Sequence, residues 1–280
     1  MYVLDTLSHR LKRGCETMAY PDGPAPALPD RHGGALRVDG AKCVDGCTAC
    51  ITVCPTEAIA RPSLAKASNG QGHGAVALDL GRCIFCTECI AVCPTHAITQ
   101  TGDHRMAVRR RDDLVLGTAG QEELRLAVAL DDKLRKLLGR SLRLRQVSAG
   151  GCAACEADTN VLGTIGWDLG RFGIQFVASP RHADGLLITG PVSKGMELAL
   201  RKTWEAVPGP KIVIAVGACA IAGGPFVGHP EVLNGADAVV PVDLYIPGCP
   251  PHPLTILDGL LRILGRLEGK AGGAAPTGTG

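Results

Sequence analysis

The cysteines are the residues of this chain whose type and spacing could do chemistry, and their pattern occurs twice. The stretch CTACITVCPTEAI (residues 47–59) returns as CTECIAVCPTHAI (86–98), with ten of the thirteen positions identical. The total of thirteen cysteines is odd, and the N-terminus has no apolar run typical of a secretory signal, so a disulfide framework is disfavoured. Reduced thiols at regular spacing instead indicate metal binding.

The spacing indicates which kind of metal centre this is. The second copy, with the cysteine before it, reads C-x2-C-x2-C-x3-C-P from Cys83 to Pro94, the run of bacterial iron-sulfur ferredoxins. In that run three cysteines bind one cluster and the fourth binds the other. Two zinc sites are the alternative, but these usually have separated C-x2-C pairs, often with histidine. The spacing predicts two [4Fe-4S] clusters, the first held by Cys43, Cys47, Cys50 and Cys93, and the second by Cys83, Cys86, Cys89 and Cys54.

The first run departs from this pattern, because three residues rather than two separate Cys43 from Cys47. Asp45-Gly46 is a turn dipeptide that can absorb the extra residue within a loop, so Cys43 is kept as a ligand. Between the two runs, turn signals at residues 69–74 precede an alternating stretch over residues 75–80. This order predicts a hairpin that returns the chain from the first run to the second.

Residues 1–115 resemble the two-cluster ferredoxin subunits of formate hydrogenlyases, membrane-bound hydrogenases and respiratory complex I. The likeness extends beyond the cysteines to RGCETMAYP near the start, LGRCIFC at the second run and HRMAVRRRDDL after it. It implies a bacterial ferredoxin-like 2[4Fe-4S] domain that relays electrons. Cys15 has no place in either run and is interpreted as a buried or incidental free thiol.

The second half of the chain has a different pattern. Residues 119–140 place leucines and a valine among alternating charges, which predicts an amphipathic helix that connects two domains. Beyond it, short apolar runs alternate with helix-length segments, which indicates a parallel sheet with helices on both faces. The five runs are LRLRQV, IQFVAS, DGLLITG, KIVIAVG and AVVPVDLYIPG. The expected fold class is therefore α+β with two domains, the second of them α/β.

Four further cysteines follow these apolar runs. Cys152 and Cys155 come after the first run, Cys219 after the fourth and Cys249 after the fifth, each with glycines nearby. Ligands bind outside the carboxyl ends of parallel strands, so three strand-to-helix loops can bring these four thiols together. The glycines allow the backbone to approach a bulky cluster and to donate N–H groups to its sulfurs.

The loops that carry these cysteines also resemble a known family. GGCAACEAD, RHADGLLITGPV, GACAIAGGPF and VPVDLYIPGCPPHP are similar to the small, cluster-bearing subunit of membrane-bound (group 4) [NiFe] hydrogenases and to its homologue beside the quinone site of complex I. The resemblance covers about residues 138–268 and implies a flavodoxin-like domain. The complex I relatives carry two adjacent cysteines where this chain has C-x2-C, which favours the hydrogenase side. The resemblance implies that a third [4Fe-4S] cluster, the one nearest the catalytic subunit, is bound by Cys152, Cys155, Cys219 and Cys249.

Two acidic residues and two histidines lie near these motifs. Glu156 and Asp158 are interpreted either as a proton relay or contact with the catalytic subunit, or as helix N-terminal charges favoured by the macrodipole. For His182 in RHAD and His252 in CPPHP, hydrogen bonding or packing is the expected role.

Composition narrows the function further. The net charge is +2 and aromatic residues make up 3%, so nucleic-acid binding is disfavoured. No uncharged apolar run approaches the roughly twenty residues that span a bilayer. There is no Walker loop and no G-x-G-x-x-G fingerprint, and only Cys15 remains once twelve cysteines are assigned. The substrate chemistry is therefore expected on another chain, and no complete active site on this one.

Together these patterns predict an electron-transfer subunit made by fusion of two subunits. The expected divisions are a ferredoxin-like domain (1–118), a helical connector (119–140), a hydrogenase-type domain (141–268) and a flexible tail (269–280). Three clusters would relay electrons between a soluble partner, such as formate dehydrogenase or ferredoxin, and a [NiFe]-type large subunit. Membrane-arm subunits would hold the complex on the cytoplasmic face. The alternatives are a complex I-like NADH/ferredoxin:quinone oxidoreductase subunit, and a zinc-binding scaffold or nucleic-acid module.

Overall fold

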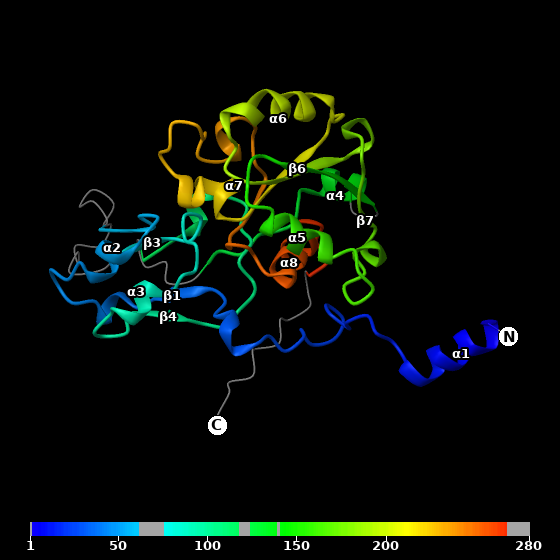
Figure 1. Ribbon diagram of the computed structural model, residues 1–280, viewed down its shortest axis with the longest axis horizontal. Helices are drawn as coiled ribbons and strands as arrows, with labels where there is room; N and C mark the ends of the chain where they lie inside the picture. The colour runs from blue at the N-terminus through cyan, green and yellow to red at the C-terminus, as the bar shows by residue number, and fades with distance from the viewer. Residues whose placement is uncertain (1, 62–75, 118–123, 139–140, 268–280) are drawn as a thin grey trace.

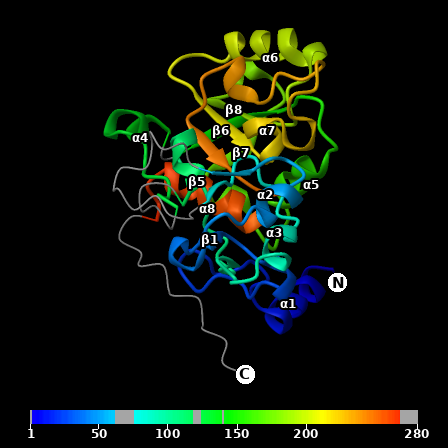
Figure 2. The same ribbon diagram turned by 90° about the vertical axis from the view of Figure 1, so that its left-hand side faces the viewer.

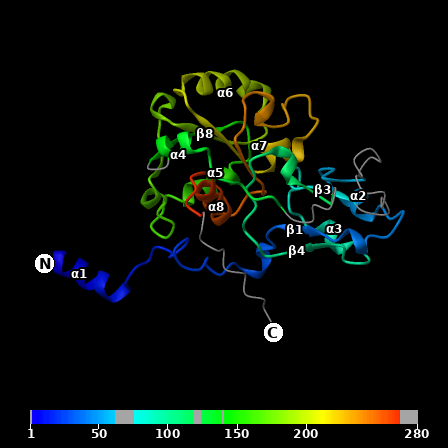
Figure 3. The ribbon, with the colours of Figure 1, turned by 180° about the vertical axis from the view of Figure 1, so that it is seen from behind.

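The computed structural model describes residues 2–61, 76–117, 124–138 and 141–267. Figure 1 shows a smaller part, coloured blue to cyan, beside a larger part coloured green to red. The same two parts can be followed in the turned views (Figures 2 and 3). Helix α1 (Tyr2–Arg13) extends away from both, and its apolar side chains Val3, Leu4, Leu7 and Leu11 are exposed.

The smaller part is built from short antiparallel strands. β1 (Leu36–Val38) pairs with β4 (Ile98–Gln100). In a second sheet, β3 (Ala77–Asp79) lies between β2 (Ile59–Ala60) and β5 (Val115–Leu116). The antiparallel pairing of β2 with β3 confirms that the chain returns between the two cysteine runs. The turn signals that the sequence places before β3, at residues 69–74, lie outside the described residues.

Each cysteine run carries one short helix. Helix α2 (Ala49–Val53) belongs to the first run and α3 (Glu88–Ala91) to the second. Both end just before a Cys-Pro pair, because the residue before a proline is disfavoured in the helical region. The repeated sequence therefore folds twice into the same local unit.

The larger part contains one parallel sheet in the strand order β10-β9-β8-β6-β7. All five apolar runs of the second half form its strands, as the sequence predicted. Every residue of β8 and β9 is buried, which is typical of strands covered on both faces. The strands are β6 (Leu142–Ser148), β7 (Ile174–Phe176), β8 (Gly185–Thr189), β9 (Ile212–Val216) and β10 (Leu244–Ile246).

Helices cover both faces of this sheet (Figures 1 and 2). Alternate residues of β8 face opposite ways: Ile188 packs in one cluster with α6 (Lys194–Ala206) and α7 (Ala218–Ala222), whereas Leu187 packs in another with α8 (Pro253–Ile263). Helix α5 (Ala154–Val161) contacts α8. Among the described residues, the 3-10 helices are Asp30–His32, Gly40–Lys42, Arg111–Leu114, Leu169–Phe172, Pro180–His182, Gly224–Phe226 and Ala236–Ala238.

The connecting segment differs from the helix predicted over residues 119–140. Only α4 (Asp132–Leu138) is helical, and residues 124–131 are not. Ala127 N–H donates to the carbonyl oxygen of Ala107 (2.7 Å), and Leu130 N–H donates to that of Ile263 (3.0 Å). Backbone bonds to neighbouring segments therefore replace those of a helix. Ala127 and Leu130 are buried, whereas Val128 is exposed. Residues 119–123 and 139–140 lie outside the described residues.

The two parts of the molecule share one hydrophobic cluster. It contains Leu80 and Val108 of the smaller part together with Ile221 and Tyr245 of the larger part. Val108 and Tyr245 also exchange two backbone hydrogen bonds of 3.0 and 2.9 Å. The two parts therefore pack directly against each other.

A strap formed by residues 17–20 binds the start of the chain to the larger part. The amide of Met18 donates to the carbonyl oxygen of Gly166 (2.9 Å), and Arg171 donates to the carbonyl oxygens of Met18 (2.7 Å) and Tyr20 (2.6 Å). The Tyr20 hydroxyl donates to Oδ1 of Asp258 (2.8 Å). This strap therefore joins segments that are distant in the sequence.

Asp258 is a fully buried carboxylate of α8. Its Oδ2 accepts a hydrogen bond from Arg262 Nε (2.6 Å), while Oδ1 accepts from Tyr20. Burial, followed by the charge of Asp258, raises the pKa of Tyr20 well above its ordinary value, so the phenol stays a neutral donor. Buried charges are tolerated only when they are paired and hydrogen-bonded, as here.

Replacing Asp258 with Ala should strongly destabilise the protein, because Arg262 would be left without its partner in a largely buried setting. Removing one partner of a buried ion pair costs about 3–5 kcal/mol, whereas Tyr20→Phe removes one hydrogen bond to a charged group, about 2 kcal/mol. We expect the thermal midpoint of the anaerobically prepared protein to fall most for Asp258→Ala and less for Tyr20→Phe. The control is Glu205→Gln, which breaks an exposed ion pair with Lys202. An Asp258→Ala midpoint equal to that of the control would show that the buried pair contributes nothing to stability.

Candidate cluster-binding sites

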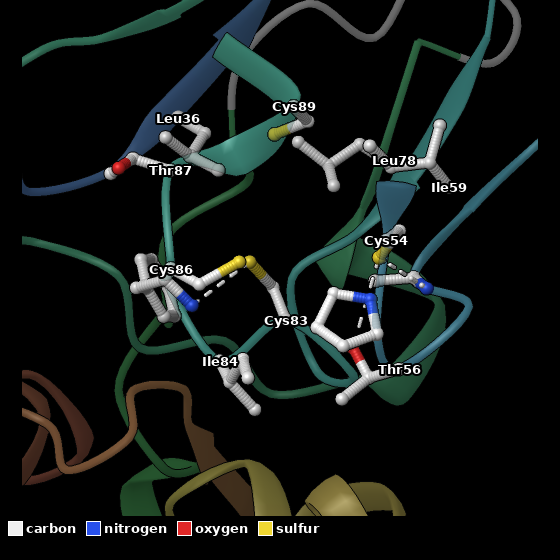
Figure 4. Close-up of a pocket in the computed structure, with 13 residues that line it drawn as sticks. Leu36, Cys54, Thr56, Ile59, Leu78, Cys83, Ile84, Cys86, Thr87 and Cys89 are labelled. Atoms are coloured by element: carbon white, nitrogen blue, oxygen red, sulfur yellow. Dashed lines mark hydrogen bonds between the residues drawn. The ribbon is translucent and has the colours of Figure 1, made fainter. Parts of the chain in front are cut away.

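Two recesses in the smaller part are each lined by four cysteines, and each set combines both runs. In the recess of Figure 4 the sulfur atoms point toward a common space, whose empty volume with its open mouth is about 380 Å³. The other recess measures about 350 Å³. The first cysteine site consists of Cys43, Cys47, Cys50 and Cys93. The second cysteine site consists of Cys54, Cys83, Cys86 and Cys89. The structure thus brings together the two crossed sets that the spacing predicted.

A tight turn after each Cys-Pro pair carries the fourth cysteine to the other site. Cys54 Sγ accepts a hydrogen bond from the Ala58 amide (3.2 Å) and lies 3.9 Å from Thr56 Oγ1. Glu57 within this turn has a positive φ of 50°. The second copy repeats these features around Cys93 at Ala97 (3.2 Å), Thr95 (3.9 Å) and His96 (φ 52°). Both crossing thiols therefore receive a backbone N–H, a contact that tunes the reduction potential of iron-sulfur clusters.

The extra residue of the first run is absorbed in a turn. The Cys47 amide donates to the Val44 carbonyl oxygen (3.2 Å), so Asp45 and Gly46 are the central residues of a β-turn, as the dipeptide predicted. Gly46 has a φ of 79°, a left-handed conformation that glycine adopts without strain. Cys43 still lines the first cysteine site. The insertion changes the loop and not the set of cysteines that meet.

Apolar side chains form the walls of the second cysteine site. Leu36, Ile59, Leu78 and Ile84 line it beside the four cysteines (Figure 4). An apolar shell controls solvent access and the local dielectric around a metal centre. The Phe85 amide donates to Cys83 Sγ (3.3 Å), which adds a second N–H donor to this site.

The third cysteine site lies at the carboxyl ends of β6, β9 and β10. Cys152 and Cys155 follow β6, Cys219 lies in α7 after β9, and Cys249 follows β10. Burial raises the pKa of Cys155 to about 12 and that of Cys219 to about 11, and in each case the nearby cysteines contribute further. Gly217, two residues before Cys219, lies against both Cys155 Sγ and the carbonyl oxygen of Gly248. The three loops therefore meet here, although Cys152 and Cys249 are nearly a hundred residues apart. The third cysteine site consists of Cys152, Cys155, Cys219 and Cys249.

Glycines make room for these thiols. A Cβ atom on Gly217 would lie 2.5 Å from Cys155 Sγ, and one on Gly224 would lie 2.7 Å from Cys219 Sγ. Both distances are too short for a real carbon atom, and both glycines have a positive φ, so a larger residue at either position would be strained and would displace a thiol. Cys152 is exposed and Cys155 is half-buried. The site is therefore open to the surface on one side.

Burial also governs the thiols of the smaller part. It raises the pKa of Cys83 to about 12 and that of Cys89 to about 11. For Cys93, burial acts in the same direction, but the amides of Ala97 and Thr95 outweigh it and the pKa is lowered. Since thiolates are the metal ligands, cation binding must supply the free energy that deprotonates the buried thiols.

The remaining residues singled out by sequence have ordinary contacts. Cys15 lies apart from the three cysteine sites, with its Sγ 3.7 Å from the Thr17 carbonyl oxygen. It is exposed, so of the two roles that the sequence suggested, a buried or an incidental free thiol, the buried one is wrong. His252 Nδ1 accepts from the Leu254 amide (3.1 Å) and caps α8, which confirms a hydrogen-bonding role. His182 is exposed in a 3-10 helix.

Glu156 is held at the edge of the third cysteine site. Its Oε1 accepts from Thr189 Oγ1 (2.7 Å) at the end of β8. Burial acts to raise its pKa, but hydrogen bonds from Ser148 and Thr189 outweigh burial and lower it. Burial raises the pKa of Asp158. Sequence patterns did not single out Ser148 and Thr189, although their place at strand ends was a usable signal.

Single-ion metal sites and membrane-spanning helices are both absent from the described residues. No group of three or more His, Cys, Asp or Glu side chains there is arranged so that it could hold one metal ion. No helix among them is long and apolar enough to cross a membrane.

Comparison with known proteins identifies both halves. Residues 34–97 match the family described as 4Fe-4S dicluster domain, and residues 152–263 match NADH ubiquinone oxidoreductase, 20 Kd subunit. A probable membrane-bound hydrogenase subunit, mbhJ of Pyrococcus furiosus, is 40% identical over 144 residues, which cover 51% of this chain and 86% of that protein. The chain belongs to the NADH ubiquinone oxidoreductase 20 kDa subunit family. The resemblance of its second half that the sequence indicated is thereby confirmed.

Two other similar proteins each match about half of this chain. Formate hydrogenlyase subunit 7 of Escherichia coli (strain K12) is 44% identical over 143 residues, so the chain spans 56% of that protein's length and the match covers 51% of the chain. Among solved structures, the membrane-bound sulfane sulfur reductase, an archaeal respiratory membrane complex, has a chain that is 32% identical with a TM-score of 0.43, covering 51% of this chain and 78% of that one.

The crossed arrangement of the first two sites can be tested with matched alanine variants. Cys54→Ala should damage the same cluster as Cys83→Ala, because the two thiols line one recess, and Cys93→Ala should match Cys47→Ala for the other. EPR spectra of the reduced, anaerobically prepared variants report which signal disappears. Cys15→Ala is the control and should leave every signal intact. Loss of the same signal in Cys54→Ala and Cys47→Ala would show that the sites are not crossed.

Proposed function

We propose that this chain is an iron-sulfur electron-transfer subunit of a membrane-associated hydrogenase or formate hydrogenlyase-like complex. It relays electrons between a soluble redox partner, such as formate dehydrogenase or ferredoxin, and a [NiFe]-type large subunit. The observation that carries this proposal is the gathering of twelve cysteines into three four-cysteine sites. The names of the relatives support the kind of complex, since two of them are a formate hydrogenlyase subunit and a probable membrane-bound hydrogenase subunit.

Each of the three cysteine sites fits a [4Fe-4S] cluster. Four thiols are the ligand set that such a cluster requires, and when bound it supplies one-electron redox chemistry. The chain's own residues hold the thiols in place, donate N–H groups to Cys54, Cys83 and Cys93, and surround the second site with apolar side chains. Hydrogen bonds to sulfur and solvent exposure are the levers that set the potential.

The arrangement also favours clusters over single zinc ions. Around one zinc ion, bond lengths of about 2.3 Å bring four sulfurs to within about 4 Å of one another. A cubane binds each thiolate at a different iron, so its cysteines stand farther apart. The crossing of Cys54 and Cys93 between the two recesses supports the second case, since zinc sites usually draw on separated C-x2-C pairs.

The order of the sites suggests a path through the molecule. Gly81, two residues before Cys83, lies against Ile221, two residues after Cys219. This contact makes the second cysteine site a neighbour of the third. At the first site, the turn residue Val44 is 47% exposed, which leaves this end accessible to an external partner.

The larger part supports a flavodoxin-like assignment. Numbered along the chain, its strands run 2-1-3-4-5 across the sheet, the order of flavodoxin-like folds.

The proposed divisions of the chain remain 1–118, 119–140, 141–268 and 269–280, the last of which lies outside the described residues. The third site opens at the carboxyl edge of this sheet, where a hydrogenase-type large subunit would bring its own redox centre. No complete active site is assigned to this chain, and membrane-arm subunits would account for its place at the cytoplasmic face.

The second candidate is a subunit of a complex I-like NADH/ferredoxin:quinone oxidoreductase. The family match to the 20 kDa subunit of NADH ubiquinone oxidoreductase supports it directly. The spacing Cys152-x2-Cys155, in place of adjacent cysteines, favours the hydrogenase side. The nickel-binding cysteines of the partner large subunit would distinguish the two.

The cluster content follows from this proposal. Anaerobically prepared protein should contain about twelve iron and twelve acid-labile sulfide per chain, since each of three cubanes holds four of each. Iron and sulfide analysis with parallel zinc analysis is the measurement. Zinc without labile sulfide would overturn the proposal and favour the zinc-binding scaffold.

The relay itself is tested at Cys249, which is exposed at the edge of the third site. In the reconstituted complex, Cys249→Ala should abolish hydrogen evolution or quinone reduction, because electrons would no longer reach the catalytic partner. The two clusters of the smaller part should still be bleached by dithionite. Cys15→Ala is the matched control and should keep full activity. Normal activity in a Cys249→Ala sample that lacks the third cluster would show that electrons bypass this site.

A further inference from the structure

A direct contact joins the second cysteine site to the third. A Cβ atom on Gly81 would lie 2.8 Å from Ile221 Cγ2 and 2.7 Å from Arg111 Cζ, so the backbone at Gly81 touches both side chains. Gly81 is two residues before Cys83, and Ile221 is two residues after Cys219. The route between these two thiols therefore runs along two short stretches of chain joined by one van der Waals contact.

An ion pair fixes the turn that presents Gly81. Arg111 donates through NH1 to Asp79 Oδ1 (2.8 Å) and through NH2 to Oδ2 (2.6 Å), the two-bond geometry that only a guanidinium can make. Asp79 Oδ1 also accepts from the Gly81 amide (2.8 Å), and its carbonyl oxygen accepts from the Cys83 amide (3.1 Å). Both side chains are largely buried, with exposures of 24% and 19%. A shift of Arg111 would thus be passed to the loop that carries Cys83.

The segment that carries Arg111 is bound to the larger part as well. Three residues before it, Val108 forms the two-bond bridge to Tyr245 of β10, and Arg109 Nε donates to the Asp243 carbonyl oxygen (2.8 Å). Strand β10 leads directly to Cys249. Residues 108–111 therefore contact both sites: Val108 bonds to β10, which precedes Cys249, and Arg111 bonds to the turn that precedes Cys83.

We propose that Arg111 is a positioning residue for electron transfer: its pair with Asp79 sets the separation of the second and third cysteine sites, and electrons cross at the Gly81–Ile221 contact. The inference rests on the proposed function, since it requires clusters at both sites. One electron leaves one site and enters the other, so one cluster is oxidised and the other reduced, with no bond formed or broken and no proton moved.

The experiment compares variants of Arg111 in the full-length, anaerobically prepared chain. Arg111→Lys keeps the charge but loses the paired hydrogen bonds, and Arg111→Gln loses both. We expect each to lose the rapid phase in which the third cluster is reduced after the clusters of the smaller part, and to lose the magnetic splitting between the second and third clusters in EPR. Iron content should stay unchanged in both variants, and the cluster potentials should stay unchanged in Arg111→Lys, which keeps the charge.

A matched control separates positioning from general stability. Arg105 forms a similar two-bond pair with Asp103, with side-chain exposures of 30% and 27%. Beside Asp103, the charged or titratable groups near Arg105 include Asp258, Tyr20 and His104, and none of these belongs to the Gly81 turn. Arg105→Lys should leave the rapid phase and the splitting intact. Equal losses in Arg105→Lys and Arg111→Lys would overturn the inference, because the pair would then act only through stability.

A second variant tests the contact from the other side. Ile221→Ala leaves the Asp79–Arg111 pair in place and replaces no assigned ligand. If Arg111→Gln loses iron and cannot be interpreted, this variant still tests whether electrons cross at the contact. We expect loss of the rapid phase with the EPR splitting retained, because the separation is kept while the contact is removed. A rapid phase unchanged in both Ile221→Ala and Arg111→Lys would overturn this inference but would leave the proposed function standing. Absence of the third cluster, or of any transfer, in the unmodified protein would instead overturn the proposed function.

Discussion

The exchange of Cys54 and Cys93 between the two cysteine runs is the constraint on which the smaller part depends. Neither run can complete a four-thiol site alone, so each must fold against the other before either recess exists. The Cys-Pro turn achieves this, because proline ends the short helix and the amide four residues on binds the departing sulfur. The sheets β1-β4 and β2-β3-β5 then follow as the short connections that hold the two turns face to face.

The third site meets the same requirement by a different route. Its four thiols come from three loops, and they are brought together only when β6, β9 and β10 align in one parallel sheet. Burying these thiols close together has a cost, because burial, and after it the neighbouring cysteines, raises the pKa of Cys155 and Cys219. Glycine at residues 217 and 224 removes the steric part of that cost. The electrostatic part is left for bound cations to offset.

Local patterns in the sequence predicted which cysteines of the smaller part lie together, because the close spacing of Cys83, Cys86 and Cys89 places their thiols on one short loop. The five strands were equally predictable, since their apolar runs are short and bounded by turn residues. The helix expected over residues 119–140 failed over residues 124–131, where tertiary hydrogen bonds replaced helical ones. Propensity cannot foresee such partners, because Ala107 and Ile263 are distant in sequence.

The contacts between the two parts were beyond sequence reasoning for the same reason. Tyr20 and Asp258 are 238 positions apart, and nothing in the local sequence around either residue marks it as one partner of a pair. Such pairs help to hold the segments that they join against each other. A peptide link raises the local concentration of one part around the other but does not fix their orientation. That orientation is fixed by the strap at residues 17–20 and by residues 108–111, which contact the larger part at α8 and at β10. A chain that joins two electron carriers therefore needs both kinds of connection. The covalent link keeps the two parts together, and the buried polar contacts fix their relative orientation.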